Sequence, residues 1–262
     1  MNFKIVIPAR YASTRLPGKP LLEIAGKPMI QHVYERAADS GADEIVIATD
    51  DQRIADRTAG FGAEVFMTSA THISGTERIA EVVAELGWDD HTIVVNLQGD
   101  EPTMPAALLT QVATDMDTHP DAQVTTLAAP INEREMLFDP HVVKVVTDGA
   151  GYAQYFSRAP IPWHRDEFIH PDRPLPQGVG FLRHIGLYAY RAGFLEKYVN
   201  WPPTPLEQAE SLEQLRVIWH GDRIHVSEAS EEPGHGVDTL DDLHRVEKEF
   251  GGSPGRKETK SI

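Results

Sequence analysis

The strongest constraint on the fold is an alternation of short β-branched runs with segments of helical spacing in the first half of the chain. The expected strands are residues 3–8, 44–49, 64–67 and 92–97. The expected helices are residues 29–38, 52–61, 76–86 and 106–116. The strand runs are continuously apolar, which is typical of strands buried on both faces. The pattern predicts an α/β fold with helices on both faces of a mainly parallel sheet.

The second half of the chain is less regular. The expected strands are residues 122–129, 142–147, 151–162, 181–190 and 224–227, and the expected helices are residues 206–219 and 240–250. Residues 164–180 are rich in Pro, Gly and charge, which indicates a long loop. Since no linker separates the two halves, we expect one domain over residues 1–250 with an irregular subregion at about 150–195. Residues 251–262 have no apolar face and are expected to form a disordered tail.

Composition excludes several classes of partner and site. The 262 residues carry 24 Lys and Arg against 40 Asp and Glu, a formal charge of −16. This balance argues against a nucleic-acid partner and against an anionic membrane surface. The absence of cysteine excludes disulfides, Cys-ligated metals and thiol catalysis. No apolar run approaches the length of a membrane span, so the expected location is the cytoplasm.

A basic loop follows the first expected strand. Residues 8–20 place Arg10, Arg15 and Lys19 beside small residues such as Ser13. Ligands bind at the carboxyl edge of open α/β sheets, and small side chains let backbone N–H groups reach an anion. The loop is neither a P-loop nor a GxGxxG motif, and an exposed basic connection is the alternative. Residues 1–36 carry a net charge of +4 against −20 for the rest, which favours a local anion site.

Residues 7–21, IPARYASTRLPGKPL, resemble the nucleotide-binding loop of the CMP-Kdo synthetases, the 3-deoxy-manno-octulosonate (Kdo) cytidylyltransferases. Six later motifs resemble that family in the same order: SGTER (74–78), NLQGDEP (96–102), YFSRA (155–159), LRHIGLY (182–188), LEQLR (212–216) and GVDT (236–239). The resemblance runs from residue 1 to about residue 250. It implies a three-layer, Rossmann-like nucleotidyltransferase fold with an inserted subregion for dimerisation and substrate binding.

The family resemblance implies a reaction and its catalytic residues. CTP and Kdo would give CMP-Kdo and pyrophosphate, for lipopolysaccharide core biosynthesis. Lys19, Asp100 and Asp238 are the implied catalytic residues, with Mg²⁺ held by Asp100 and Asp238. Carboxylates with substrate phosphates are the usual ligands of Mg²⁺. The residues alone leave a solvated turn at Asp100 and a helix cap at Asp238 or Thr239 as alternatives.

The resemblance also implies the binding residues for the nucleotide. They are Arg10, Ser13, Arg15, Lys19, Ser74, Gly75, Arg78 and Gln98. Ser74 and Glu77 fit a capping box before a helix, an alternative that is compatible with a ligand at the same helix N-terminus.

The implied sugar-acid pocket draws on the second half of the chain. Its residues are Gln98, Arg158, His184, Tyr188, Glu213 and Gln214. Arg158 can hold a carboxylate with two hydrogen bonds, while the Tyr, Glu and Gln side chains can bond hydroxyls. The alternative places Glu213 and Gln214 on the polar face of an amphipathic helix. The aromatic-rich subregion and the family resemblance together predict a homodimer.

Three other functions compete with Kdo activation. A CMP-sialate synthetase has a related loop, but residues 13–20 and the RHIGLY motif at 183–188 resemble the Kdo enzymes. A related enzyme that activates 8-amino-8-deoxy-Kdo would differ only around the C8 of the sugar. A non-catalytic protein that binds nucleotide or sugar acid is disfavoured, because Arg10, Lys19, Asp100 and Asp238 are all present.

Overall fold

The computed structural model describes residues 1–12, 16–170 and 172–251. Within these residues one sheet contains the strands β1 (Phe3–Ala9), β4 (Glu44–Thr49), β5 (Glu64–Met67), β6 (Ile93–Asn96), β7 (Val124–Pro130), β8 (Lys144–Thr147), β9 (Ala153–Ser157), β10 (Leu182–Arg191) and β11 (Ile224–Glu228). A separate small hairpin pairs β2 (Glu23–Ile24) with β3 (Lys27–Pro28).

The helices of the described residues alternate with these strands through the first half. They are η1 (Lys19–Leu21, a 3₁₀ turn), α1 (Met29–Ala38), α2 (Gln52–Ala59), α3 (Gly75–Glu85), α4 (Ala106–Thr118), α5 (Arg134–Phe138), α6 (Ala192–Val199), α7 (Pro205–Glu210), α8 (Leu215–Trp219) and α9 (Leu240–Gly251).

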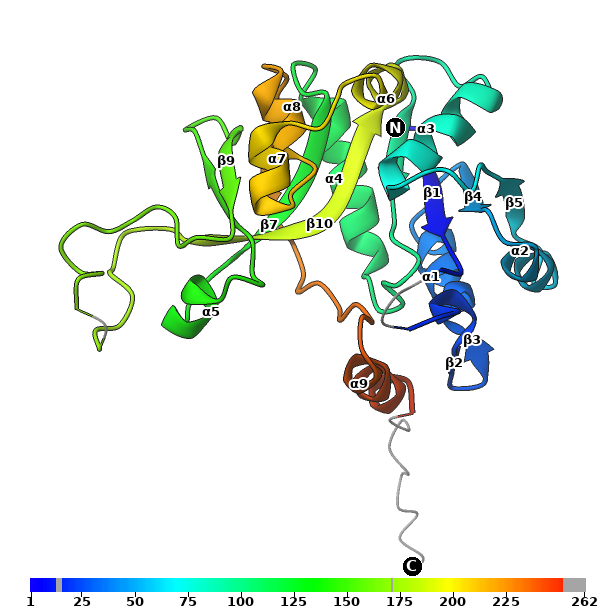
Figure 1. Ribbon diagram of the computed structural model, residues 1–262, viewed down its shortest axis with the longest axis horizontal. Coiled ribbons are helices and arrows are strands. Elements are labelled where there is room, and N and C mark those ends of the chain that lie inside the picture. Colours follow the sequence, from blue (N-terminus) through cyan, green and yellow to red (C-terminus); the bar gives the residue numbers. More distant parts are fainter. Residues whose placement is uncertain (13–15, 171, 252–262) are drawn as a thin grey trace, which may run out of the picture.

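The main sheet runs in the order β11-β7-β10-β6-β1-β4-β5. Strand β1 is parallel to β4 and β6, and β11 is parallel to β7, while β10 is antiparallel to both of its neighbours β6 and β7. Strand β8 pairs antiparallel with β10 and with β9. Figure 1 shows β9 and the loop that follows it on the side of the molecule opposite α2. The prediction of an α/β fold with a mainly parallel sheet is confirmed.

Two hydrophobic cores lie on opposite faces of the sheet. Alternate residues of β1 enter different cores: Ile5 and Ile7 pack with α1 and α4, whereas Val6 packs with α3 and α6. Fully burying one such aliphatic side chain stabilises the fold by about 1.5–3 kcal/mol. Continuous apolar strands are therefore required, because each strand of the centre contributes to both cores.

The apolar spacing of the sequence predicted the bounds of most helices and strands to within a few residues. The bounds of α1, β4 and β5 agree with the predicted residues 29–38, 44–49 and 64–67, and the described residues of 164–180 form no helix or strand, as predicted. The pattern did not indicate α5, α6, η1 or the β2–β3 hairpin. The predicted tail begins one residue too early, because residue 251 ends α9, and the rest of that tail, residues 252–262, lies outside the described residues.

The prediction of one helix over residues 206–219 is wrong. Ser211 adopts a left-handed backbone (φ 52) and ends α7, and α8 starts only at Leu215. A buried ion pair explains the break, because Arg216 on α8 folds back to donate a 2.8 Å hydrogen bond from Nε to Glu207 Oε2 on α7. Glu213 and Gln214 therefore lie in the turn between two short helices and not on a helix face.

The helices in the described part of the chain are too short or too polar to cross a lipid bilayer.

Candidate active site

The two ends of the loop after β1 meet at the aromatic ring of Tyr11. Gly18 has a left-handed backbone (φ 70) and donates from N–H to the Tyr11 carbonyl at 3.0 Å. A Cβ at Gly18 would lie 3.0 Å from the Tyr11 ring, so glycine is needed for this close approach. The Arg53 guanidinium lies 3.3 Å from the centre of the same ring. The loop thus presents Lys19 at the start of η1.

The Lys19 ammonium joins the two predicted catalytic carboxylates. Its Nζ donates to Asp100 Oδ2 at 2.5 Å, to Asp238 Oδ1 at 3.1 Å and to the Val237 carbonyl at 2.9 Å. The main chain adds a further link, since the Val237 N–H donates to the Asp100 carbonyl at 2.9 Å. Three segments that are far apart in the sequence therefore meet at the Lys19 ammonium group.

Thr239, and not Asp238, caps α9. Thr239 Oγ1 accepts from the Asp242 N–H at 3.2 Å, and Asp242 Oδ2 accepts from the Thr239 N–H at 3.0 Å. This reciprocal pair satisfies the helix N-terminus. The Asp238 carboxylate instead contacts the Lys19 ammonium.

Glu101 adds a third carboxyl group that the sequence did not single out. Burial, together with the neighbouring negative charges of Asp100 and Asp238, raises its pKa to about 8 against the opposing effect of Lys19. Gly236 makes room for this side chain, because a Cβ there would lie 2.7 Å from Glu101 Oε1. The carboxyl groups around the Lys19 ammonium supply more negative charge than it can neutralise. A divalent cation bound there would reduce the repulsion between them.

Helix α3 points its N-terminus toward the same edge. Ser74 is its N-cap, with Oγ accepting from the Glu77 N–H at 3.2 Å. The predicted capping box forms only in part, because Glu77 Oε2 accepts from the Ile73 N–H at 2.9 Å and not from that of Ser74. Further along α3, the buried Arg78 donates to Asp50 Oδ2 at 2.9 Å and to Thr68 Oγ1.

Two cavities open between these elements. The first, about 310 Å³, is lined by Pro8, Ala9, Arg10, Lys19, Pro20, His72, Ile73, Ser74, Gly75, Arg78, Gln98, Gly99, Asp100, Glu213 and Asp238. The second, about 340 Å³, is lined by Gly75, Thr76, Asn96, Gln98, Val124, Tyr188, Tyr190, Tyr198, Ser211, Leu212, Glu213, Gln214 and Val217. Gly75, Gln98 and Glu213 line both, so the cavities adjoin.

The second cavity is rich in hydroxyl and amide groups. Burial raises the pKa of Tyr188, Tyr190 and Tyr198, so their phenols stay protonated. Burial also raises the pKa of Glu213, whose Oε2 accepts from Thr76 Oγ1 at 3.3 Å. Gln214 is only 8% exposed, and its Nε2 has no hydrogen-bond partner among the described residues. A buried amide without a partner is costly and points to a missing ligand group.

The structure does not place every candidate residue at the two cavities. His184 lies behind the second, with Nε2 at 3.1 Å from Thr126 Oγ1 and its ring 5.3 Å from that of Tyr188. Burial lowers its pKa to about 3. Arg158 donates from Nε to the Glu210 carbonyl at 2.7 Å and lines neither cavity. Ser13 and Arg15 lie outside the described residues.

Several site residues carried no signal in the sequence. His72 lines the first cavity and its Nε2 lies 2.5 Å from Glu81 Oε2, while Tyr190 and Tyr198 line the second. A lone histidine in a loop and tyrosines in a strand or helix resemble ordinary surface or core residues. Of these additional residues, only Glu101 could have been suspected from the sequence, because it lies directly beside Asp100.

Comparison with known proteins agrees with the geometry. A family model described as cytidylyltransferase matches residues 4–224. The 3-deoxy-manno-octulosonate cytidylyltransferase of Idiomarina loihiensis is 56% identical over 248 residues, covering 95% of this chain and 98% of that protein. The enzyme of the same name from Pasteurella multocida is 57% identical over 251 residues, covering 94% of this chain and 97% of that protein.

The comparison with a solved structure indicates the same family. CMP:2-keto-3-deoxy-manno-octonic acid synthetase complexed with CTP superposes with a TM-score of 0.87 at 42% identity, over 96% of this chain and 99% of that one. The fold is that of a nucleotidyltransferase. The chain belongs to the cytidylyltransferase family, and its predicted place among the 3-deoxy-manno-octulosonate cytidylyltransferases is confirmed.

Proposed function

We propose that the first cavity binds CTP and the second binds Kdo, so that the cytidylyl group is transferred where the cavities meet. The observation that carries this division is that Gly75, Gln98 and Glu213 line both cavities. The activity is that of a Kdo cytidylyltransferase, which forms CMP-Kdo and pyrophosphate from CTP and Kdo. No covalent intermediate with the protein is needed, because positioning and charge neutralisation suffice.

The first cavity suits a triphosphate. Arg10 and Lys19 supply positive charge, and the N-terminus of α3 at Ser74 and Gly75 supplies N–H groups and the favourable end of the helix dipole. Arg78 contributes to the wall but is bound to Asp50, so its proposed role is to shape the nucleotide pocket. Ser13 and Arg15 stay predictions, drawn from the family resemblance, for the same phosphates.

The second cavity suits a polyhydroxylated acid. The Tyr188 hydroxyl and the Gln214 amide can bond sugar hydroxyls, and the Gln214 Nε2 donor lacks any other partner among the described residues. Glu213 and Gln98 lie at the junction and can contact both substrates. Roles for Arg158 and His184 in holding the sugar acid stay predictions.

The residues present fit a hard divalent cation. Asp100 and Asp238 offer carboxylate oxygens that share one ammonium, and Glu101 adds a buried carboxyl group beside them. We propose Mg²⁺, because it prefers oxygen ligands and substrate phosphates. When bound, this ion would neutralise phosphate charge and lower the pKa of the attacking hydroxyl.

The chain then positions the two reacting atoms. The 2-hydroxyl oxygen of Kdo gives up its proton to solvent water and forms a bond to the α-phosphorus of CTP, the bond from that phosphorus to the bridging oxygen breaks, and pyrophosphate leaves. Arg10 and Lys19 hold the charge that develops on the leaving group, while Tyr188 and Gln214 fix the sugar. We also propose that the chain acts as a homodimer, with the half-exposed Trp163 and the exposed Ile169 of the irregular subregion at the interface.

The division of the cavities is tested by a pair of substitutions. Tyr188→Phe should raise the KM for Kdo several-fold and leave the KM for CTP unchanged, because it removes one hydroxyl from the second cavity. Arg10→Ala should do the reverse. Steady-state release of pyrophosphate with each substrate varied in turn measures both constants. Equal effects of either substitution on both KM values would contradict the division.

A further inference from the structure

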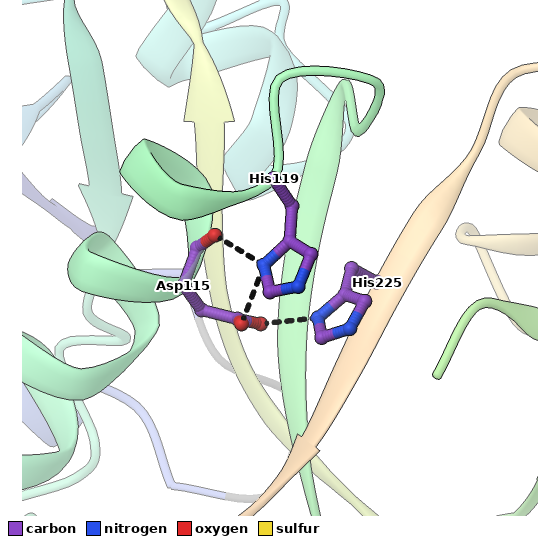
Figure 2. A group of neighbouring side chains, drawn as sticks. All are labelled: Asp115, His119 and His225. Atoms are coloured by element: carbon purple, nitrogen blue, oxygen red, sulfur yellow. Dashed lines mark hydrogen bonds and ion pairs between the residues drawn. The ribbon is translucent and has the colours of Figure 1, made fainter. Parts of the chain in front are cut away.

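Three side chains outside both cavities converge at the far end of α4. Asp115 lies in the last turn of this helix, His119 is its C-cap residue one turn later, and His225 projects from the neighbouring strand β11 (Figure 2). Spacing of four residues places Asp115 and His119 on one side of the helix. The three residues have ligand atoms within 4.8 Å of one another.

The carboxylate of Asp115 holds the cluster together. Its Oδ2 lies 2.7 Å from His225 Nδ1, and its Oδ1 lies 3.1 Å from His119 Nδ1. Both imidazoles thus turn the same type of nitrogen toward one carboxylate, as Figure 2 shows. The side chains of Asp115 and His225 are 8% and 9% exposed, whereas that of His119 is 33% exposed.

We propose that Asp115, His119 and His225 bind a divalent transition-metal ion, with Zn²⁺ the best match to the ligands. Two imidazole nitrogens and one carboxylate oxygen are a ligand set that suits Zn²⁺, whereas Mg²⁺ prefers oxygen alone. Neutral imidazoles and a single carboxylate leave the ion one positive charge. Three protein ligands also leave one position of a tetrahedral ion for water.

A neighbouring cavity supplies space for that water. It is lined by Asp115 together with Thr118 and Ser227, and it opens widely to solvent. Ser227 follows His225 by two residues on β11, so both side chains face α4. The Ser227 hydroxyl is buried and has no hydrogen-bond partner among the described residues.

The two rings differ in their freedom to move. They are stacked with centres 3.6 Å apart and planes inclined by 16°, so an ion in the plane of one ring lies out of the plane of the other. His225 is fixed, because Gly151 brings the backbone so close that a Cβ there would lie 2.6 Å from His225 Nε2. His119, at the end of the helix and partly exposed, is the ligand that must rotate on binding.

The proposed ion would join α4 to β11 at a point where the ring of Tyr152 packs on that of His225, with centres 5.1 Å apart. None of the three ligands lines the two substrate cavities. The site is therefore separate from the proposed Mg²⁺ site, and its effect would be on stability rather than on the chemical step.

Titration of the untagged, metal-stripped full chain with Zn²⁺ in excess Mg²⁺ tests the proposal. The excess Mg²⁺ occupies the carboxylate site, and isothermal calorimetry counts the Zn²⁺ that remains bound. We expect one Zn²⁺ per chain in the wild type. His119→Gln, His225→Gln and Asp115→Asn should each weaken binding at least about tenfold. His91→Gln, which alters an exposed histidine that is not part of the cluster, should bind as the wild type does.

A second measurement separates binding from misfolding. His119→Gln changes the most exposed ligand, so its circular dichroism should match that of the wild type. Zn²⁺ should raise the midpoint of thermal unfolding of the wild type and of His91→Gln but not of His119→Gln. Absence of bound Zn²⁺ in the wild type, or equal affinity in His119→Gln and His91→Gln, would mean a hydrogen-bonded cluster only and overturn the proposal.

Discussion

Glu207→Gln is expected to lower the free energy of unfolding by about 3–5 kcal/mol, because it leaves a buried guanidinium without its counter-charge. Glu207 Oε2 accepts from Arg216 Nε at 2.8 Å, and Glu207 Oε1 accepts from Arg216 Nη2. Both side chains are only 9% exposed. The hydrogen bonds that Glu207 accepts raise the pKa of Arg216. An arginine stays charged at neutral pH even without such a partner, so the substitution leaves a buried positive charge.

The substitution also weakens a helix cap. Glu207 Oε2 accepts from the Thr204 N–H at 3.0 Å and completes the capping box that starts α7. Because α7 and α8 flank the turn with Glu213 and Gln214, loosening their contact should shift both side chains in the second cavity. The KM for Kdo should therefore rise while the KM for CTP stays near its wild-type value.

Urea unfolding followed by circular dichroism measures the loss of stability. Glu232→Gln is the matched control: its carboxylate pairs with Arg183 at 3.0 Å but its side chain is 86% exposed, so a change below about 1 kcal/mol is expected. If Glu207→Gln costs no more than Glu232→Gln, the buried pair does not hold α7 to α8, and the explanation of the helix break fails.

Three further predictions concern the two cavities and the histidine behind them. An unfolded histidine titrates near pH 6.5 and His184 near 3, so only the unfolded chain gains this proton as the pH falls below 6.5. The stability advantage of the wild type over His184→Gln should then shrink by up to about 1.4 kcal/mol per pH unit, measured by urea unfolding; a constant difference would refute this. Gln214→Leu should leave stability unchanged or raised by about 1 kcal/mol while the KM for Kdo rises at least about tenfold; a clear loss of stability would show that the amide has a partner. Lys19→Ala should reduce turnover at least about a hundredfold, and near-normal pyrophosphate release would exclude its assigned role.

The elements that the sequence predicted best are those set by local periodicity. Residues of α1 pack against the sheet and β4 is one of its strands. Both have apolar spacings that are visible within ten residues, so their bounds could be predicted directly. The break at Ser211 could not, because it depends on Arg216 folding back onto Glu207, a contact that does not interrupt the apolar spacing of residues 206–219.

The candidate site also contains some residues that local sequence features predict and others that they do not. The basic loop could be located from Arg10 and Lys19, whose position after a strand is a local property. The meeting of Asp100 with Asp238 depends on a main-chain bond between distant segments, and only the family resemblance had paired them. Tyr190 and Tyr198 were missed because a buried tyrosine in a pocket has the same pattern as one in a core.

Pyrophosphate release by Asp100→Asn, at saturating CTP, Kdo and Mg²⁺, tests the central claim most directly. The claim is that Asp100 and Asp238, brought together on Lys19, form the catalytic carboxylate pair in the first cavity. The substitution should leave circular dichroism unchanged, because Asp100 is partly exposed, and should lower turnover at least about a hundredfold. Turnover within about tenfold of the wild type would contradict the claim.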